Sequence, residues 1–524
     1  MKTFAMWGVA MAVMSVVGVV DAAQPAVTAF KDAAKIKSWD AWDDHKKPEP
    51  PKEKPCVTWK KLNSLDPGLK EIGRLAVRDA KDIKSSKWSV GCETMDRALD
   101  NCSHKSVVFA VPEPNSGRWS MFERRLGMFV HWGIYSVGGW HEQEEMRRGM
   151  SRADYEKFAG RFTAEKFDAD ALVGVAESAG AEYIVFTAKH HDGFCMWDTK
   201  TTDFKVTNTP AKRDVLAELA AACRRRGMKL GLYYSNPDWH HSNAHNDKAT
   251  HQTPVQPGDE PDMAKYAEYV KAQVTELLTN YGEIVCFFWD IPTKIDRQDM
   301  DELVRRLQPG IMVNNRGWAN EDTSDYSTPE RSYAEGESDG RHVEACDSVG
   351  AQSWGYRANE DYRTLRYLTG RIDAFLAGGA NFLLNVGPKP DGAVPEESKA
   401  IMDKVGKWHK KVRDSFLNVA NLPKLKLNSA PDAIVTRRGD TLFVHFPKGL
   451  DASGVDLRPL TMKPEKVTLL NNGKILKATV ELMPSNAKNY GRETLHVWGI
   501  PTDSLANECI VLRLDFAPGA LRDF

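Results

Sequence analysis

The stretch that decides the fold is AEYIVFTAKHHDGFCMW, residues Ala181–Trp197. Its apolar run, Tyr183–Thr187, is too short for an independent helix and is rich in β-branched and aromatic residues, a composition typical of a buried strand. The run leads directly into a polar segment, Lys189–Gly193. Polar residues at the C-terminal end of a buried parallel strand are typical of the face where an α/β barrel carries its functional groups. Other strands with polar C-terminal ends should meet this one at the same rim.

Segments typical of strands and helices alternate around this stretch. The expected strands are Leu126–Ser136, the Ala181 strand, Met228–Ser235, Glu283–Asp290, Ile311–Arg316 and Asn381–Val386. The expected helices are Ser151–Gly180, a helix capped by Asp214 and ended by Gly227, Met263–Tyr281, Arg297–Leu307, Leu365–Ala377 and Glu396–Val412. Such alternation predicts a parallel sheet, and at this length a closed (β/α) TIM-like barrel. The absence of a GxGxxG or P-loop motif after the first strand excludes the main open-sheet nucleotide binders.

The chain divides into four parts by composition. Residues 1–23 have a Lys near the start, an apolar run and small residues, which predicts a signal peptide. Residues 24–118 include a Pro-rich charged linker and are predicted to form an N-terminal extension. Residues 119–420 carry the barrel pattern, and residues 421–524 contain short strands separated by turns, which predicts a C-terminal antiparallel β-sandwich.

Composition limits the partners. The chain has a net charge of −1 and 42% hydrophobic residues, so it lacks the basic excess that nucleic acids or acidic lipids require. The leader predicts export, to a periplasm or to the outside of the cell, with no retained membrane anchor. Export would place the eight cysteines in an oxidising compartment. We expect one disulfide at most among Cys56, Cys92 and Cys102, and buried free thiols within the predicted elements.

The strand ends gather a characteristic set of polar side chains. They are His131, His190, His191, Tyr233, Asp290, Asn315 and Arg316, with Glu330 on a following loop. Two carboxylates among histidines, a tyrosine and tryptophans match the needs of glycoside hydrolysis: a nucleophile or base, a proton donor, and groups that bind sugar hydroxyls and ring faces. Asp290 ends an apolar strand and is the candidate nucleophile. Position alone leaves open that Asp290 only caps a helix and that Glu330 is a solvated loop residue.

The same region offers a second interpretation, a metal site. Its candidate ligands are His190, His191, Asp192, Asp238, His240, His241 and His245. Imidazole and carboxylate groups are ordinary zinc ligands. Adjacent residues of an extended chain point to opposite sides, however, so two consecutive histidines cannot easily bind one ion. We therefore expect neither a metal nor a cofactor.

Several motifs together resemble those of the α-L-fucosidases of glycoside hydrolase family 29. They are LGMFVHWGIYS, YIVFTAKHHDGFCMWDT, RDVLAELAAACRRRGMKLGLYYS, the FFWD strand, VNNRG, SWGY and GGANFLLNVGPKPDG. The resemblance extends from about Leu126 to Asn418. It implies a barrel followed by a β-sandwich, and a retaining double displacement that removes terminal α-L-fucose from an oligosaccharide or polysaccharide.

The resemblance also implies roles for individual residues. It makes Asp290 the nucleophile and Glu330, within DYSTPER, the acid/base, with Asp325 in reserve and Glu335 and Glu344 as further alternatives. The fucose pocket would consist of residues from five motifs: His131, Glu142, His190, His191, Tyr233 and Arg316.

The 6-methyl group of fucose needs an apolar contact, which Phe288 and Trp289 are positioned to supply. Two alternatives remain at this stage, a non-catalytic fucose-binding protein on the same fold and a related α-L-galactosidase.

Overall fold

The computed structural model describes most of the chain from residue 124 onward. The described residues are 58–60, 74–79, 106–111, 124–295, 297, 299–318, 324–331, 342–422, 427, 430–484 and 493–522. The predicted signal peptide lies outside them, as do Cys56, Cys92 and Cys102 and the alternative acid Glu335.

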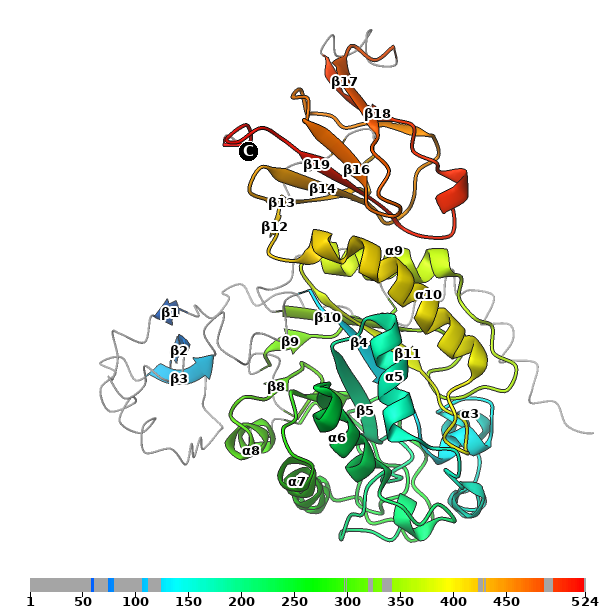
Figure 1. Ribbon diagram of the computed structural model, residues 1–524. Coiled ribbons are helices and arrows are strands. Elements are labelled where there is room, and N and C mark those ends of the chain that lie inside the picture. The colour runs from blue at the N-terminus through cyan, green and yellow to red at the C-terminus, as the bar shows by residue number, and fades with distance from the viewer. Residues whose placement is uncertain are drawn as a thin grey trace, which may run out of the picture. The chain divides into compact units, whose positions relative to one another are not determined.

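Eight parallel strands form the barrel at the centre of the fold (Figure 1). They follow one another around the ring in chain order, the first and last lie side by side, and a bridge between Asn314 and Tyr326 joins the remaining two edges. The strands are β4 (Leu126–Val130), β5 (Tyr183–Lys189), β6 (Lys229–Ser235), β7 (Cys286–Asp290), β8 (Met312–Val313), β9 (Tyr326–Ser327), β10 (His342–Ser348) and β11 (Asn381–Val386). The predicted barrel is confirmed.

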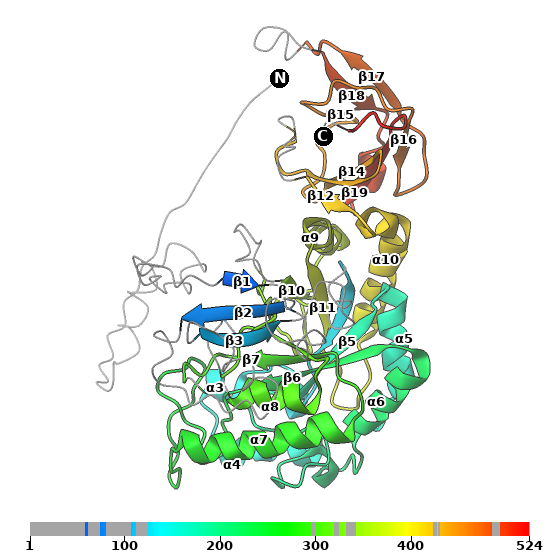
Figure 2. The same ribbon diagram turned by 90° about the vertical axis from the view of Figure 1, so that its left-hand side faces the viewer.

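Helices cover the outside of the strands, with α7 and α8 along β6 and β7 (Figure 2). The helices from α3 to α10 are α3 (Glu144–Arg148) and α4 (Arg152–Glu156) in the segment after β4, then α5 (Ala169–Ala179), α6 (Val215–Arg226), α7 (Met263–Asn280), α8 (Asp299–Leu307), α9 (Leu365–Gly378) and α10 (Glu396–Val412). Asp214 caps α6 by accepting a hydrogen bond from the Ala217 N–H, and Gly227 ends it with a φ of 69°. Both boundaries are as predicted.

Two parts of the barrel differ from the prediction. The single helix expected over Ser151–Gly180 is divided into α4 and α5, because Phe162 and Phe167 leave the helical path to pack against Trp132. The stretch between β8 and α9, in which we predicted no strand, contains β9 and β10. β10 carries His342, Glu344 and Asp347 in place of an apolar run, so its sequence does not match a buried strand.

The inside of the barrel has a core of its own. It consists of Phe129, Tyr183, Val185, Tyr233, Cys286, Phe288, Met312, Tyr326, Cys346 and Leu383, all buried. Alternate residues on the same strands point outward and pack under the helices in a larger core. At the N-terminal end of the barrel, Tyr183 donates a hydrogen bond of 2.6 Å to Glu344. Burial raises the pKa of Glu344 to about 8, so this carboxyl is neutral.

The C-terminal region forms two antiparallel sheets around a second core, as predicted. The first contains β12 (Ala420–Asn421), β13 (Ile434–Arg438), β14 (Thr441–Phe446), β19 (Ile510–Asp515) and β16 (Lys466–Leu469). The second contains β15 (Gly454–Asp456), β18 (Thr494–Trp498) and β17 (Lys477–Glu481). Helix α9 contacts both β11 and the strands β13 and β14. The Trp408 indole donates a 3.0 Å hydrogen bond to the Cys509 carbonyl, and Cys509 belongs to the barrel's outer core.

Short strands β1 (Thr58–Lys60), β2 (Arg74–Asp79) and β3 (Ser106–Val111) form an antiparallel sheet. Among the described residues, no helix combines the length and the hydrophobicity needed to cross a bilayer. The five cysteines in the described part of the chain are free and buried: Cys195, Cys223, Cys286, Cys346 and Cys509.

The N-cap of α6 should be a measurable source of stability. Besides the Ala217 N–H, the Asp214 carboxylate accepts hydrogen bonds from the Asp198 N–H at 3.1 Å and the Tyr281 hydroxyl at 2.8 Å. We expect Asp214→Ala to lower the free energy of unfolding in urea by about 1–3 kcal/mol. Asp214→Asn, which also caps helices, should lose less. The exposed Asp451→Ala is the control, and equal losses in Asp451→Ala and Asp214→Ala would contradict the prediction.

Candidate active site

The C-terminal ends of the strands bring the predicted polar residues together. His131 follows β4, the His190–His191 pair follows β5, and Tyr233 lies near the end of β6. The other members of the group come from β7 and the loops after β8 and β9: Asp290, Arg316 and Glu330. Contacts among these side chains define one site, described below.

Asp290 is held by neighbours that favour its charge. The Tyr233 hydroxyl donates a hydrogen bond of 2.7 Å to Oδ2, Arg316 donates one of 3.0 Å to Oδ1, and Nε2 of His191 lies 3.9 Å from Oδ2. Burial opposes ionisation, but Arg316, His191 and Tyr233 outweigh it and lower the pKa of Asp290 to about 2. Asp290 is therefore an ionised carboxylate over the whole neutral range.

Glu330 shares a guanidinium with Asp290. Nη1 of Arg316 donates a hydrogen bond to each carboxylate, at 3.0 Å to Asp290 and at 3.2 Å to Glu330. The indole of Trp354 donates a further bond of 3.2 Å to the other oxygen of Glu330. The Glu330 side chain is 41% exposed, against 13% for that of Asp290. The two carboxyls thus differ in solvent access.

Three neutral histidines line the site. Nδ1 of His131 bonds to Asn385 at 2.7 Å, and Nδ1 of His191 bonds to Ser235 at 2.6 Å, which fixes both rings. The His190 ring stacks on Tyr233 with centroids 5.6 Å apart. Burial lowers the pKa of all three, to about 3 for His191 and well below the usual value for His190. Uncharged imidazoles can both donate to and accept from hydroxyl groups.

His190 has a free polar atom. Its Nδ1 is buried and has no hydrogen-bond partner within the described part of the chain. A buried polar atom without a partner is costly, and a hydroxyl of a bound ligand would satisfy it.

Glu142 is buried and bonds to the loop that follows β10. Its Oε2 accepts hydrogen bonds from the Ser353 hydroxyl at 2.7 Å and from the N–H groups of Trp354 and Gly355 at 2.9 and 3.2 Å. Burial opposes its charge, but His141 and these hydrogen bonds lower the pKa of Glu142 to about 2. In this structure Glu142 anchors the loop that carries Trp354.

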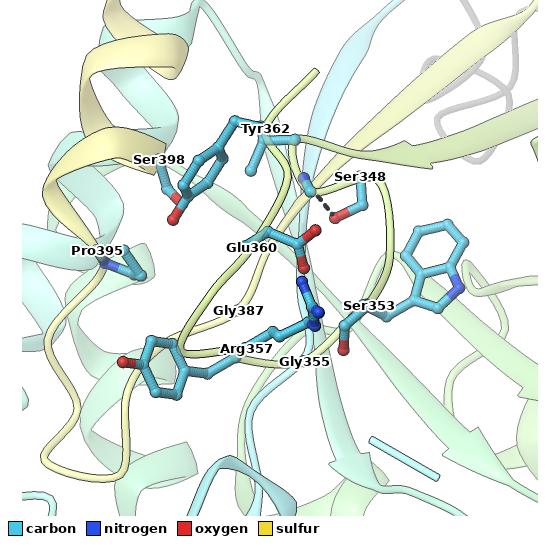
Figure 3. A pocket seen from close by; sticks show the side chains of 13 residues that line it. Ser348, Ser353, Gly355, Arg357, Glu360, Tyr362, Gly387, Pro395 and Ser398 are labelled. Carbon is cyan, nitrogen blue, oxygen red and sulfur yellow. Dashed lines mark hydrogen bonds between the residues drawn. The ribbon is translucent and has the colours of Figure 1, made fainter. Parts of the chain in front are cut away.

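This loop has a hollow beside it. Figure 3 shows the side chains around the hollow, among them Ser353, Arg357, Glu360 and Tyr362. Trp354 and Ser353 line this hollow and also belong to the group around Glu330 and Glu142. Because the loop is not packed tightly on that side, its hydrogen bonds to Glu142 are important for its position.

Trp289 does not join the site. Its side chain is fully buried on the outer face of β7, where the indole donates a 2.9 Å hydrogen bond to Asp301 of α8. Side chains alternate along a strand, so Asp290 and Phe288 point inward and Trp289 points outward. Phe288 packs inside the barrel against Phe129, with ring centroids 5.3 Å apart.

The alternative acids are also away from the site. Asp325 is buried and accepts hydrogen bonds from Arg305 and the Val313 N–H, both at 2.8 Å. Glu344 lies at the N-terminal end of the barrel beside Tyr183. Of the three candidate acids that the structure describes, Glu330 is the one that contacts Arg316, the partner of Asp290.

The structure separates the proposed metal ligands. The described residues contain no group of three or more histidine, cysteine, aspartate or glutamate side chains placed to hold a metal ion. Asp238 instead forms a buried ion pair with Lys189 at 2.8 Å, and His240 pairs with Glu156 at 2.9 Å. His245 pairs with Asp247.

Two site residues escaped the sequence analysis. Trp354 was visible only as part of the SWGY motif, in a stretch without regular periodicity. His251 lies on the long loop after β6, with its ring 5.6 Å from that of His191. Its backbone has a φ of 59°, and no sequence pattern marks it.

Comparison with known proteins agrees with this geometry. The family model described as alpha-L-fucosidase matches residues 115–413, more than half of the chain. The chain belongs to the α-L-fucosidase family. Membership makes it a glycoside hydrolase and confirms the resemblance found in the sequence motifs.

Individual family members show the extent of the similarity. The tissue alpha-L-fucosidase of Rattus norvegicus is 29% identical over 361 residues, which cover 62% of this chain and 77% of the rat protein. The structure of alpha-L-fucosidase isoenzyme 1 from Paenibacillus thiaminolyticus matches with a TM-score of 0.66 and 31% identity, over 76% of this chain and 99% of that one. The Thermotoga maritima alpha-fucosidase in complex with fucose matches with a TM-score of 0.61 and 27% identity, over 76% and 96%.

The charge of Glu142 should appear in the pH dependence of stability. A pKa of about 2, below the value of about 4.3 for an unfolded glutamate, means that its stabilisation is complete above the unfolded value and is lost as the pH falls through about 2. We expect Glu142→Gln to lower the free energy of unfolding by about 3 kcal/mol at pH 7, and the difference from wild type to shrink between pH 5 and pH 3.

Urea unfolding at several pH values measures this difference. Glu283→Gln, at an exposed position, is the matched control and should show no such trend. A gap for Glu142→Gln that stays constant with pH would show that the charge does not hold the Trp354 loop.

Proposed function

We propose that the protein is a retaining exo-α-L-fucosidase that releases terminal α-L-fucose from an oligosaccharide or polysaccharide. The observation that carries this proposal is the single Arg316 nitrogen bound to both Asp290 and Glu330. Two oxygens that accept hydrogen bonds from the same nitrogen cannot be farther apart than the sum of the two hydrogen-bond distances. That limit is below the separation of about 6.5–9.5 Å that inverting glycosidases need to admit a water molecule.

In the first step, Asp290 attacks the anomeric carbon. Its low pKa keeps it ionised, and Tyr233 and Arg316 hold its two oxygens in fixed positions. Glu330 donates a proton to the glycosidic oxygen as the bond to the leaving group breaks, and the sugar becomes an ester of Asp290.

In the second step, Glu330 acts as the base. It removes a proton from a water molecule that attacks the anomeric carbon, and Asp290 is released as a carboxylate. Two inversions at the same carbon retain the α configuration. The exposure of Glu330 suits this role, because the leaving group and the water must both reach it.

The remaining site residues fit a sugar with several hydroxyl groups. His131, His190 and His191 are neutral, and each presents ring nitrogens at the rim. We propose that they bind the fucose hydroxyls, with one of these hydroxyls satisfying Nδ1 of His190. Phe288, on the inner face of the barrel, is the candidate contact for the 6-methyl group.

We further propose that the protein is exported. Residues 1–23, with Lys2 followed by an apolar run and small residues, support this. Expression of the full chain in its native host, followed by cell fractionation and N-terminal sequencing, should find a mature protein that begins near Gln24 outside the cytoplasm. A cytoplasmic protein with Met1 intact would contradict it.

The nucleophile can be tested by chemical rescue. We expect Asp290→Gly to hydrolyse an aryl α-L-fucoside on the order of 10⁴-fold more slowly or worse. Added azide, attacking from the face that Asp290 occupied, should restore turnover and give β-L-fucosyl azide, identified by proton NMR. An α-configured azide from this variant would contradict the assignment.

Azide rescue of a variant without the acid/base should give the other anomer of the fucosyl azide. In Glu330→Ala the ester with Asp290 can still form from an activated aryl fucoside, so azide should release α-L-fucosyl azide. Without azide, turnover should fall about 10²–10⁴-fold. Asp325→Ala is the matched control, since it removes the reserve candidate, and it should not be rescued by azide.

The same assay separates the alternative functions. Faster hydrolysis of the matching aryl α-L-galactoside would indicate an α-L-galactosidase. Fucose binding by calorimetry without hydrolysis would indicate a binding protein.

A further inference from the structure

The chain turns sharply at the end of β7, directly after Asp290. Ile291 adopts a left-handed conformation with a φ of 58°. For a β-branched residue this conformation is strained, and it persists only where the surroundings enforce it. Arg331, which follows Glu330, is also left-handed, with a φ of 49°.

On the β6 side the strand ladder reaches Asp290, but on the β8 side it stops short of this turn. The pairing between β7 and β8 ends at Phe287 and Val313, before the chain reaches Asp290 or Arg316. The side chain of Asn314 extends the contact by bonding to the N–H and the carbonyl of Trp289, at 2.9 and 2.8 Å. Beyond these residues, the two segments are joined by a 3.4 Å hydrogen bond from the Thr293 N–H to the Gly317 carbonyl and by the side chain of Asn236.

Asn236 bonds to both of these segments. It follows β6, is 2% exposed, and donates its backbone N–H to the Asp290 carbonyl at 3.0 Å. Its carboxamide Nδ2 donates to the carbonyl of Ile291 at 2.8 Å and to that of Arg316 at 2.9 Å. Because both neighbours are carbonyl oxygens, only the NH₂ end of the carboxamide can face them.

The backbone of Asn236 is fixed by a tyrosine of α7. The Tyr266 hydroxyl donates a hydrogen bond of 2.9 Å to the Asn236 carbonyl. The same hydroxyl accepts a bond of 3.0 Å from Lys189, which forms the buried ion pair with Asp238. These contacts therefore fix the backbone from which the Asn236 carboxamide extends.

We propose that Asn236 is a positioning residue of the fucosidase reaction, because its carboxamide joins the strained turn after Asp290 to the tip of β8 and thereby fixes Asp290 against Arg316. This rests on the proposed function only for its effect on rate. The structural part, that Asn236 imposes the left-handed turn on Ile291, can be tested without any substrate.

The kinetic test uses Asn236→Ala and Asn236→Asp on an aryl α-L-fucoside. Asn236→Asp is isosteric but replaces the NH₂ donor by a negative oxygen facing two carbonyls. Displacement of a catalytic group by about 1 Å costs up to about 10²-fold, so we expect kcat to fall about 10–100-fold in both variants, with KM within about threefold of wild type.

Asn471→Ala is the matched control. Asn471 is also buried, and its carboxamide also bridges separate segments, but it lies in the C-terminal sheets and bonds to Cys509 and Val511. It should lose stability while keeping its kcat. A kcat for the Asn236 variants equal to that of Asn471→Ala would overturn the proposal. Should Asn236→Ala fail to fold, Asn236→Ser, which keeps one donor, must still lose kcat.

The test without substrate is a double-mutant cycle. The urea midpoint of unfolding is measured for wild type, for Asn236→Ala, for Ile291→Gly and for the variant with both substitutions. Glycine adopts the left-handed turn without strain, so Ile291→Gly should raise the midpoint of the otherwise unchanged chain. It should raise the midpoint less in the Asn236→Ala background, where the turn is free to relax. Equal shifts in both backgrounds would overturn the proposal.

Lys212→Gly is the control for the cycle. Lys212 also has a left-handed conformation, with a φ of 50°, on an exposed loop without a contact to Asn236. Lys212→Gly should change the urea midpoint by the same amount with and without Asn236→Ala. Wild-type protein that folds but hydrolyses no fucoside would contradict the proposed function, while the cycle would still decide the role of Asn236.

Discussion

The closed ring of parallel strands is the constraint on which the rest of this structure depends. All eight strands run in one direction, so their C-terminal ends form one rim. Side chains alternate between the inside and the outside along each strand, so only every second residue can contribute to that rim. This rule places Asp290 and Phe288 inside the barrel and Trp289 under α8. It also brings Tyr233 of β6 to the carboxylate at the end of the neighbouring strand.

Electrostatics at the rim then follow from burial and from one cation. Burial keeps the three histidines neutral and would also neutralise Asp290 if that residue were alone. Although burial opposes the charge of Arg316, Asp290 and Glu330 raise its pKa above the usual value. Arg316 is therefore a permanent positive charge between two carboxylates. It favours the ionised form of Asp290 and holds Glu330 close to it.

Sequence patterns predicted the elements with strong periodicity and missed those with polar residues inside. The Ala181 strand, α6 and α10 have boundaries close to those predicted, because apolar runs and caps mark them. β10 was missed because Glu344 and Asp347 interrupt its apolar pattern. Their carboxyl groups accept hydrogen bonds from distant parts of the chain, from Tyr183 and Tyr367, which no local pattern shows.

The candidate site was predictable to a similar degree. Residues at the ends of regular strands, such as Asp290 and Tyr233, were identified from position and motif. The position of Glu142 under the Trp354 loop depends on residues more than two hundred positions apart, and so does the pairing of His131 with Asn385. Such contacts are set by the closure of the ring, which periodicity does not describe.

The layer formed by α9 and α10 has a consequence for the modularity of the protein. Cys509 and Val511 of the C-terminal region belong to the outer core of the barrel, and His445 forms a fully buried contact of 2.8 Å with Asp373 of α9. Removing the sandwich would expose this apolar and charged surface to water. The two regions therefore share part of one core, so exchange of the sandwich between family members would require redesign of the α9 surface.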